Sequence, residues 1–174
     1  TFDLSSYAGT TVRVVFHHQS YDCYFLEIDN MSITLGGSPE PDECAITTFP
    51  YFNDFENFAS EVECWVSIDN DGDGEDWLTG TAQSGAFNGY NYSSGLVSKS
   101  YNYDEEAGVG TDLDADNYLV SPEFVLPANG TVTLSWYAMS TYAPSYPDHY
   151  EVMIAPNGST EISDFVNVYS EDGP

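Results

Sequence analysis

The chain consists of many short stretches in which apolar and polar residues alternate, separated by segments rich in Gly, Pro, Asn and Asp. Alternation with a period of two is typical of β-strands that have one buried face. Helical periodicity is confined to a stretch near 160–166, while 17–23, 69–85 and 101–116 are predicted loops. Strands are predicted at 11–16, 24–34, 62–68, 86–91, 95–100, 117–125, 130–139, 149–155 and 165–169. Many short strands of this kind predict an all-β fold, an antiparallel β-sandwich.

Composition divides the chain into two parts. The segment 36–48 opens with G-G-S-P-E-P-D-E, which is typical of a linker. After it, the apolar pattern begins again with F-P-Y-F at 49–52. We therefore predict two strands in residues 1–35, a linker at 36–48, and a larger unit over 49–174.

The charge of the chain is extreme, with 29 acidic residues against two basic ones and a net charge of −27. Nucleic acid is excluded as a partner, because binding to phosphates needs clusters of Lys and Arg. Anionic membrane surfaces would repel the chain, and its sequence contains no apolar run that predicts membrane insertion. With Arg13 and Lys99 as its basic residues, the fold must depend on apolar burial, hydrogen bonds and metal sites.

The chain has three cysteines, Cys23, Cys44 and Cys64. In an oxidising compartment this number predicts one disulfide and one free thiol. Cys44 and Cys64 enclose one aromatic-rich segment, so we favour this pair; three reduced core thiols are the alternative. A secreted chain would carry a signal peptide, so its absence here predicts that the sequence is a piece of a longer protein.

The segment D-N-D-G-D-G at 69–74 places Asp69, Asp71 and Asp73 at alternate positions of a glycine-bent loop. Carboxylates in this arrangement can converge on one hard cation, and Ca²⁺ is the usual one because it accepts six to eight oxygens in loose geometry. An ordinary turn is the alternative, because Asp, Asn and Gly also dominate turns. The loop differs from an EF-hand, since its twelfth position is Gly80 rather than a bidentate Glu.

Several motifs occur together in a fixed order along the chain. They are F-N-D-F-E-N at 52–57, C-W-V-S-I-D-N-D-G-D-G-E-D-W at 64–77, G-Y-N at 89–91, D-N-Y-L-V-S-P at 116–122, T-V-T-L-S-W at 131–136 and H-Y-E-V-M-I at 149–154. In this order they resemble the cleaved-adhesin domains of bacterial surface proteins, the jelly-roll modules of gingipain haemagglutinin regions. The resemblance covers about residues 50–170 and implies a jelly roll with a role in adhesion.

Residues 1–35 resemble the same family at its other end. D-L-S-S-Y-A-G-T-T-V-R-V-V-F-H-H at 3–18 and L-E-I-D-N-M-S-I at 26–33 look like the closing strands of such a module. The family usually has Arg before the His, where this chain has His17. The resemblance leaves three arrangements open: a fragment of a tandem array, a permuted module that closes on itself, and strands donated to a neighbouring copy. Donation between copies would generate filaments, because a head-to-tail contact does not close.

The resemblance also implies structural calcium. Jelly rolls of this type hold an ion between the first strand, a neighbouring loop and the closing strand, which makes Asp54, Glu56 and Asp29 candidate ligands. Asp116 is a further candidate, beside the loop of three aspartates. For Glu56 and Asp116 the alternative is a carboxylate that caps amides of a turn.

Catalytic chemistry finds little support in the sequence. His17 and His18 are adjacent on a predicted strand, so they point to opposite faces and cannot chelate one ion. Asp148 and His149 suggest a base with its orienting carboxylate, but no motif places a nucleophile. We predict that the chain is not an enzyme.

These observations predict an extracellular, calcium-stabilised adhesin-type module that acts in surface adhesion or as a repeating subunit of a surface filament. Its expected partners are other copies or neighbouring modules of the same protein, with host proteins or glycans as targets. The alternative is a carbohydrate-binding module of a secreted hydrolase, in which exposed tyrosines would stack on sugar rings.

Overall fold

The computed structural model describes residues 1–23, 25–34, 44–56, 61–77, 95–104, 106–140 and 144–174. Its strands are β1 (Phe2–Asp3), β2 (Thr11–Tyr21), β3 (Phe25–Thr34), β4 (Tyr51–Asn53), β5 (Val66–Asp69), β6 (Leu96–Lys99), β7 (Tyr101–Asp104), β8 (Val109–Asp112), β9 (Asp114–Val120), β10 (Phe124–Val125), β11 (Thr133–Ser140), β12 (His149–Pro156) and β13 (Val166–Asp172). Two single 3-10 turns, η1 (Ser5–Tyr7) and η3 (Ile162–Asp164), complete these elements. Within these ranges no helix is long and apolar enough to cross a membrane.

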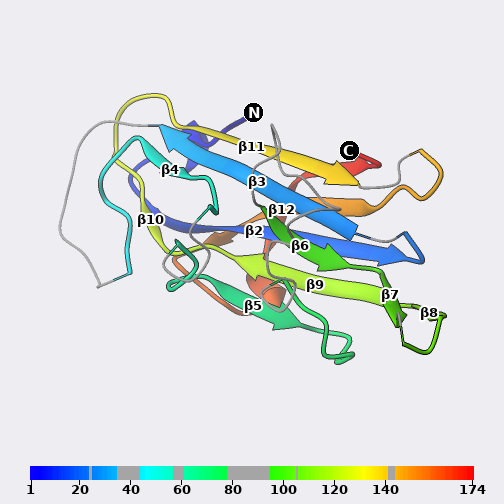
Figure 1. The fold of residues 1–174 in the computed structure, drawn as a ribbon. Coiled ribbons are helices and arrows are strands. Elements are labelled where there is room, and N and C mark those ends of the chain that lie inside the picture. The colour runs from blue at the N-terminus through cyan, green and yellow to red at the C-terminus, as the bar shows by residue number, and fades with distance from the viewer. Residues whose placement is uncertain (24, 35–43, 57–60, 78–94, 105, 141–143) are drawn as a thin grey trace.

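The strands form two layers that face each other (Figure 1). The first sheet has the order β1-β11-β3-β4, with β6 also paired to β3. The second has the order β13-β12-β2-β9-β5, with β10 also paired to β2, and β7 and β8 form a separate hairpin. Each of these strand pairs is antiparallel. The prediction of an all-β antiparallel sandwich is therefore confirmed.

Strands β2 and β3, from the first 34 residues, are interior strands of the two sheets. β2 pairs with β12 on one side and β9 on the other, and β3 pairs with β11 on one side and with β4 and β6 on the other. Their inward side chains have no exposed surface; these are Val12, Val14, Phe16, Leu26, Ile28, Met31 and Ile33. The two N-terminal strands thus supply much of the core of the sandwich formed with residues 51–172.

A bulge in β3 decides which side chains enter the core. Asn30 has a positive φ of 50°, and the register with β11 shifts at this point of the ladder. An extra residue of this kind reverses the alternation beyond it. Leu26 and Ile28 face the core before the bulge and Met31 faces it afterwards, while Glu27 belongs to the opposite face.

Three local predictions were wrong. β2 continues to Tyr21, through most of the predicted connection 17–23, because both histidines in it are buried and have hydrogen-bond partners. The predicted loop 101–116 contains the β7–β8 hairpin and the start of β9. The expected helical stretch near 160–166 is only the turn η3 followed by β13. The predicted strand at 86–91 and residues 36–43 of the predicted linker lie outside the described residues.

One disulfide joins Cys44 to Cys64, the pair favoured from the sequence, with their Cα atoms 5.6 Å apart. It ties the segment before β4 to the segment before β5. Cys23 is free and half-buried, and its thiol donates a hydrogen bond to the carbonyl of Tyr21 at 3.1 Å. The protein thus contains one disulfide and one thiol.

Candidate functional site

The loop after β5 brings three aspartates together. Oxygen atoms of Asp69, Asp71 and Asp73 lie within 4.8 Å of one another, and in the described part of the chain no other three carboxylate, thiolate or imidazole side chains do so. The loop can turn this tightly because Gly72 and Gly74 adopt positive φ values of 77° and 87°. The sequence prediction that these three carboxylates converge therefore agrees with the geometry.

Backbone amides hold the three carboxylates in place. Asp69 accepts hydrogen bonds from the amides of Gly72 at 2.6 Å and Gly74 at 2.9 Å, and the bond from Gly74 is the main reason that its pKa lies below the ordinary value. Asp71 accepts from the amide of Asp73 at 3.0 Å. Burial and the two neighbouring carboxylates raise the pKa of Asp73, against the effect of one amide bond. The loop therefore concentrates negative charge on a rigid frame.

Asp116 on β9 joins this loop to a buried histidine. Its amide donates to Asp71 Oδ2 at 2.7 Å, and its carboxylate accepts from Asn70 at 2.5 Å and lies 2.6 Å from His17 Nε2. Burial opposes its ionisation, but these bonds outweigh burial and lower the pKa of Asp116. His17 also lies 3.2 Å from Glu151 and stacks on Tyr118, with ring centroids 4.0 Å apart. Asp116 thus lies beside the loop that is predicted to bind a cation, and Asn70 and His17 orient its carboxylate.

The remaining predicted ligands lie in the first sheet. Asp29 is on β3, and Asp54 and Glu56 directly follow β4, which pairs with β3. Asp29 is 2% exposed and accepts a hydrogen bond from the amide of Asn30 at 2.6 Å. These three residues therefore lie on, or directly after, neighbouring strands of the first sheet. The loop with Asp69, Asp71 and Asp73 instead follows β5 of the second sheet. A shared ion between Asp29 and Glu56 stays a prediction.

Glu27 is a buried carboxylate that the sequence argument did not select. It is 3% exposed, and within the described chain its Oε2 atom has no hydrogen-bond partner. Burial, with a smaller effect from Asp29, raises its pKa to about 7. Strand periodicity contained a signal for it, because L-E-I-D places Glu27 and Asp29 on one face.

A second polar cluster lies inside the sandwich. The carboxylate of Asp148 is 3.1 Å from His18 Nε2 and accepts hydrogen bonds from Ser100 at 3.1 Å and Ser140 at 2.8 Å. Ser98 lies 2.9 Å from the other nitrogen of His18. His18 and Asp148 have no exposed surface, so no substrate can reach them. The suggested Asp148–His149 pair does not form, because His149 instead lies 2.7 Å from Asp172.

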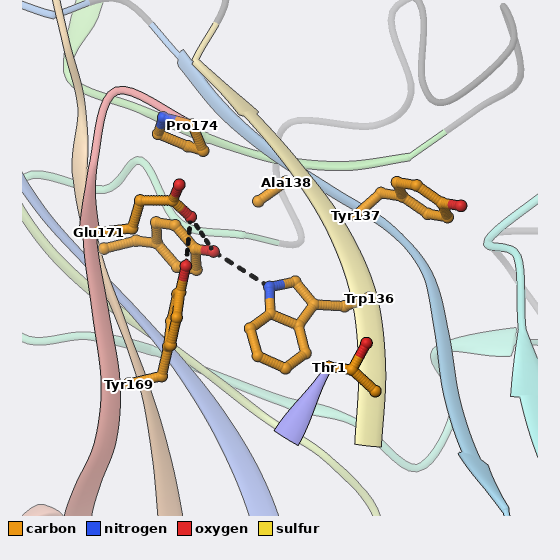
Figure 2. Close-up of a pocket in the computed structure, with 8 residues that line it drawn as sticks. Thr1, Trp136, Tyr137, Ala138, Tyr169, Glu171 and Pro174 are labelled. Carbon is orange, nitrogen blue, oxygen red and sulfur yellow. Dashed lines mark hydrogen bonds between the residues drawn. The ribbon is translucent and has the colours of Figure 1, made fainter. Parts of the chain in front are cut away.

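An aromatic cleft opens between β11 of one sheet and β12 and β13 of the other (Figure 2). Its volume is about 250 Å³, and it is lined by Thr1, Trp136, Tyr137, Ala138, Tyr150, Tyr169, Glu171 and Pro174. Tyr150 and Tyr169 both donate to one oxygen of Glu171, at 3.0 and 2.8 Å. None of these residues was selected from the sequence, because they meet only when three strands come together.

The sequence profile of a family described as Cleaved Adhesin Domain matches residues 51–173. The chain belongs to this family. Among the curated relatives of this cleaved adhesin domain, Lys-gingipain from Porphyromonas gingivalis strain ATCC 33277 is 31% identical over 171 residues, and Gingipain R1 from the same strain is 30% identical over 171. Each match covers 94% of this chain and 8% of the relative.

Hemagglutinin A from Porphyromonas gingivalis strain W83 is 35% identical over 100 residues, which is 55% of this chain and 4% of that protein. The cleaved adhesin domain thus spans less than a tenth of the length of these curated relatives. No solved structure matches the chain.

The family profile begins at Tyr51, after β2 and β3 have been completed. Matches to the two gingipains cover 94% of the chain, so they include most of the segment before that point. The similarity to these longer relatives therefore extends to residues ahead of the profile region. In this cleaved adhesin domain, the strand pair occupies the centre of both sheets.

Proposed function

We propose that the chain is an extracellular, non-catalytic module of surface adhesion, stabilised by calcium and arranged as one unit of a repeating array. Membership of the Cleaved Adhesin Domain family carries this proposal, and matches to relatives named gingipain and hemagglutinin support it. The polar cluster around His18 and Asp148 inside the sandwich argues against catalysis, because both side chains are closed to solvent. The adhesive role is tested by measuring how many beads coated with the purified chain attach to cells or matrix proteins. Attachment no greater than that of uncoated beads would contradict it.

Calcium would be held by Asp69, Asp71 and Asp73. Their donors are all carboxylate oxygens, the ligand type that Ca²⁺ prefers, and their amide bonds already orient them. Three carboxylates with oxygens within 4.8 Å repel one another, and a bound cation would relieve this repulsion. When bound, the ion would stabilise the loop and, through Asp71, its contact with β9. The donor set therefore fits the cation.

Thermal unfolding with calcium or with a chelator tests this site, because an ion that binds only the folded chain raises its melting temperature. We expect chelator to lower the melting temperature of the wild type by several degrees. Asp71→Asn should melt as the chelated wild type does and should not respond to calcium. Asp104→Asn is the matched control, since Asp104 also caps turn amides, those of Glu106 and Ala107, outside the cluster. A wild-type transition unaffected by chelator would contradict the calcium proposal.

The interior position of the N-terminal strands β2 and β3 supports the proposal of a repeating array. Without β2 and β3 both sheets lose their central strand, and the remaining edges would pair with any complementary strand. The chain can fill these positions itself, as in this structure, or neighbouring copies can exchange the pair. Light scattering and electron microscopy over a range of concentrations test exchange. Single chains at every concentration would contradict a filament and leave only a self-closed module.

A glycan array separates this proposal from the alternative of a carbohydrate-binding module. Saturable binding to particular sugars, competed by the free sugar, would favour the alternative. Adhesion to a protein target predicts attachment that free sugars do not compete.

A further inference from the structure

The aromatic cleft of Figure 2 is open to solvent at the side of the sandwich where β11 faces β12 and β13. Trp136 is half-buried, Tyr169 is 36% exposed, and Tyr150 lies at the base with 1% exposure. Their rings contact one another, with centroids of Trp136 and Tyr169 5.4 Å apart and those of Tyr150 and Tyr169 6.0 Å apart. The cleft is therefore a preformed aromatic surface beside a carboxylate, Glu171.

The polar atoms of these rings are all directed inward. Trp136 Nε1 donates to the hydroxyl of Tyr150 at 3.1 Å, and both tyrosine hydroxyls donate to Glu171 Oε2. Each ring has a single N–H or O–H group, so all three donors are used. Both bonds to the carboxylate end on Oε2, which leaves Oε1 as an acceptor. Tyr137 points away from Glu171 in Figure 2. These side chains thus offer a ligand an acceptor and aromatic faces.

Both basic side chains of the sequence that could pair with this carboxylate, those of Arg13 and Lys99, bind elsewhere. Arg13 binds the carbonyls of Gly158 and Ser121 and the carboxylate of Glu123, at 2.8, 2.9 and 3.2 Å. Lys99 binds Glu75 at 2.9 Å. These two residues are the only Lys and Arg of the sequence. A Lys or Arg side chain that pairs with Glu171 must therefore come from another molecule.

We infer that this cleft binds a lysine or arginine side chain of a partner protein, because its chemistry matches such a side chain. Ammonium and guanidinium groups carry several N–H donors and no acceptor, which complements Glu171 Oε1 beside three rings whose own N–H and O–H groups are already bonded. Cations also bind favourably over Trp and Tyr rings. The net charge of −27 attracts basic segments to the module.

This inference deepens the proposed adhesive function and rests on it, since a basic segment of the target would provide the contact. The test uses residues 1–174 with a short extension before Thr1, so that no free amino group lies at the rim of the cleft. Short peptides with one central Lys or Arg are titrated in 0.15 M salt and followed by calorimetry and the indole NMR signal of Trp136. Peptides with norleucine or citrulline at the same position are the neutral counterparts.

We expect saturable binding of the Lys and Arg peptides, a shift of the Trp136 signal, and little binding of the neutral peptides. Glu171→Gln should weaken binding about tenfold or more, because a desolvated charge pair is lost. Glutamine keeps an acceptor for both tyrosines. If this variant does not fold, Tyr169→Ala replaces it in the test, and peptide affinity should fall several-fold. Asp172→Asn is the matched control, because it removes one charge from the neighbouring residue and should change binding less than about twofold.

Equal weakening by the Glu171 and Asp172 variants would overturn the inference, because it would indicate attraction to net charge rather than to the cleft. Binding of a neutral oligosaccharide at Trp136, uncompeted by the Lys peptide, would also overturn it. The bead assay separates the two proposals. Peptide binding without attachment would contradict the adhesive function alone, whereas attachment unchanged by Glu171→Gln would contradict only the cleft as the contact.

Discussion

Replacement of Asp148 by alanine tests how the N-terminal strands are fastened to the rest of the sandwich. Asp148 precedes β12 and accepts hydrogen bonds from Ser100, which follows β6, and from Ser140 at the end of β11. His18 contacts it from β2. None of this carboxylate is exposed to water. Its removal leaves an imidazole and two hydroxyls without their acceptor inside the protein.

The expected magnitude follows from these contacts. A buried polar group that loses its partner costs about 1–3 kcal/mol, and several buried groups lose the same partner here. We therefore expect Asp148→Ala to lower the free energy of unfolding by about 4 kcal/mol. For a domain of this size the melting temperature should fall by about 10 °C, at roughly 2–4 °C per kcal/mol.

Urea unfolding followed by tryptophan fluorescence measures this change, with Asp172→Ala as the control. Asp172 also pairs with a histidine, but its side chain is 81% exposed, so its loss should cost less than about 1 kcal/mol. Combining His18→Ala with Asp148→Ala should cost less than the sum of the single changes, because each single change already removes the contact between these two groups. A loss for Asp148→Ala as small as that of the control would refute this reasoning.

Three further predictions concern stability. Replacing Cys44 and Cys64 by serine removes a crosslink over a sequence separation of 20 and should cost about 3 kcal/mol in urea unfolding under oxidising conditions. Burial raises the pKa of Glu27 from 4.5 to about 7, so the folded state favours the protonated carboxyl and stability should fall as pH rises through this window. In melting curves recorded in chelator, the melting temperature of Glu27→Gln should fall less over this pH range than that of the wild type. The pKa of Asp116 is lowered, so its contribution to folding stability is present above the ordinary pKa of 3.8 and is lost as pH falls below that value. Asp116→Asn should therefore lose less stability on acidification than the wild type does.

The sequence was sufficient for the features that depend on neighbouring residues. Alternation located most described strands, and the spacing of Asp69, Asp71 and Asp73 predicted their convergence because all three lie on one short loop. Where polar residues are buried, alternation failed. His17 and His18 read as part of a connection, yet partners on β9 and before β12 allow them to continue β2.

The aromatic cleft could not be predicted, because its parts are distant in sequence. Trp136, Tyr150 and Tyr169 come from three strands in two sheets, and their meeting depends on register across both. Registers here include shifts in the β11–β3 and β12–β13 ladders that alternation does not encode. Tertiary register, rather than local pattern, therefore decides this site.

The folding unit of this chain is larger than the segment that the family profile matches. Residues 51–173 contain the partners of β2 and β3 but not those strands, which place seven fully buried apolar side chains between the sheets. Burying one such side chain is worth about 1.5–3 kcal/mol, so their joint absence costs as much as the total stability of a typical domain, or more. The segment 51–173 must therefore obtain these strands from its own chain or from a neighbour. An array in which every unit took these strands from a neighbour would join its units through core strands, and its strength would not depend on surface contacts alone.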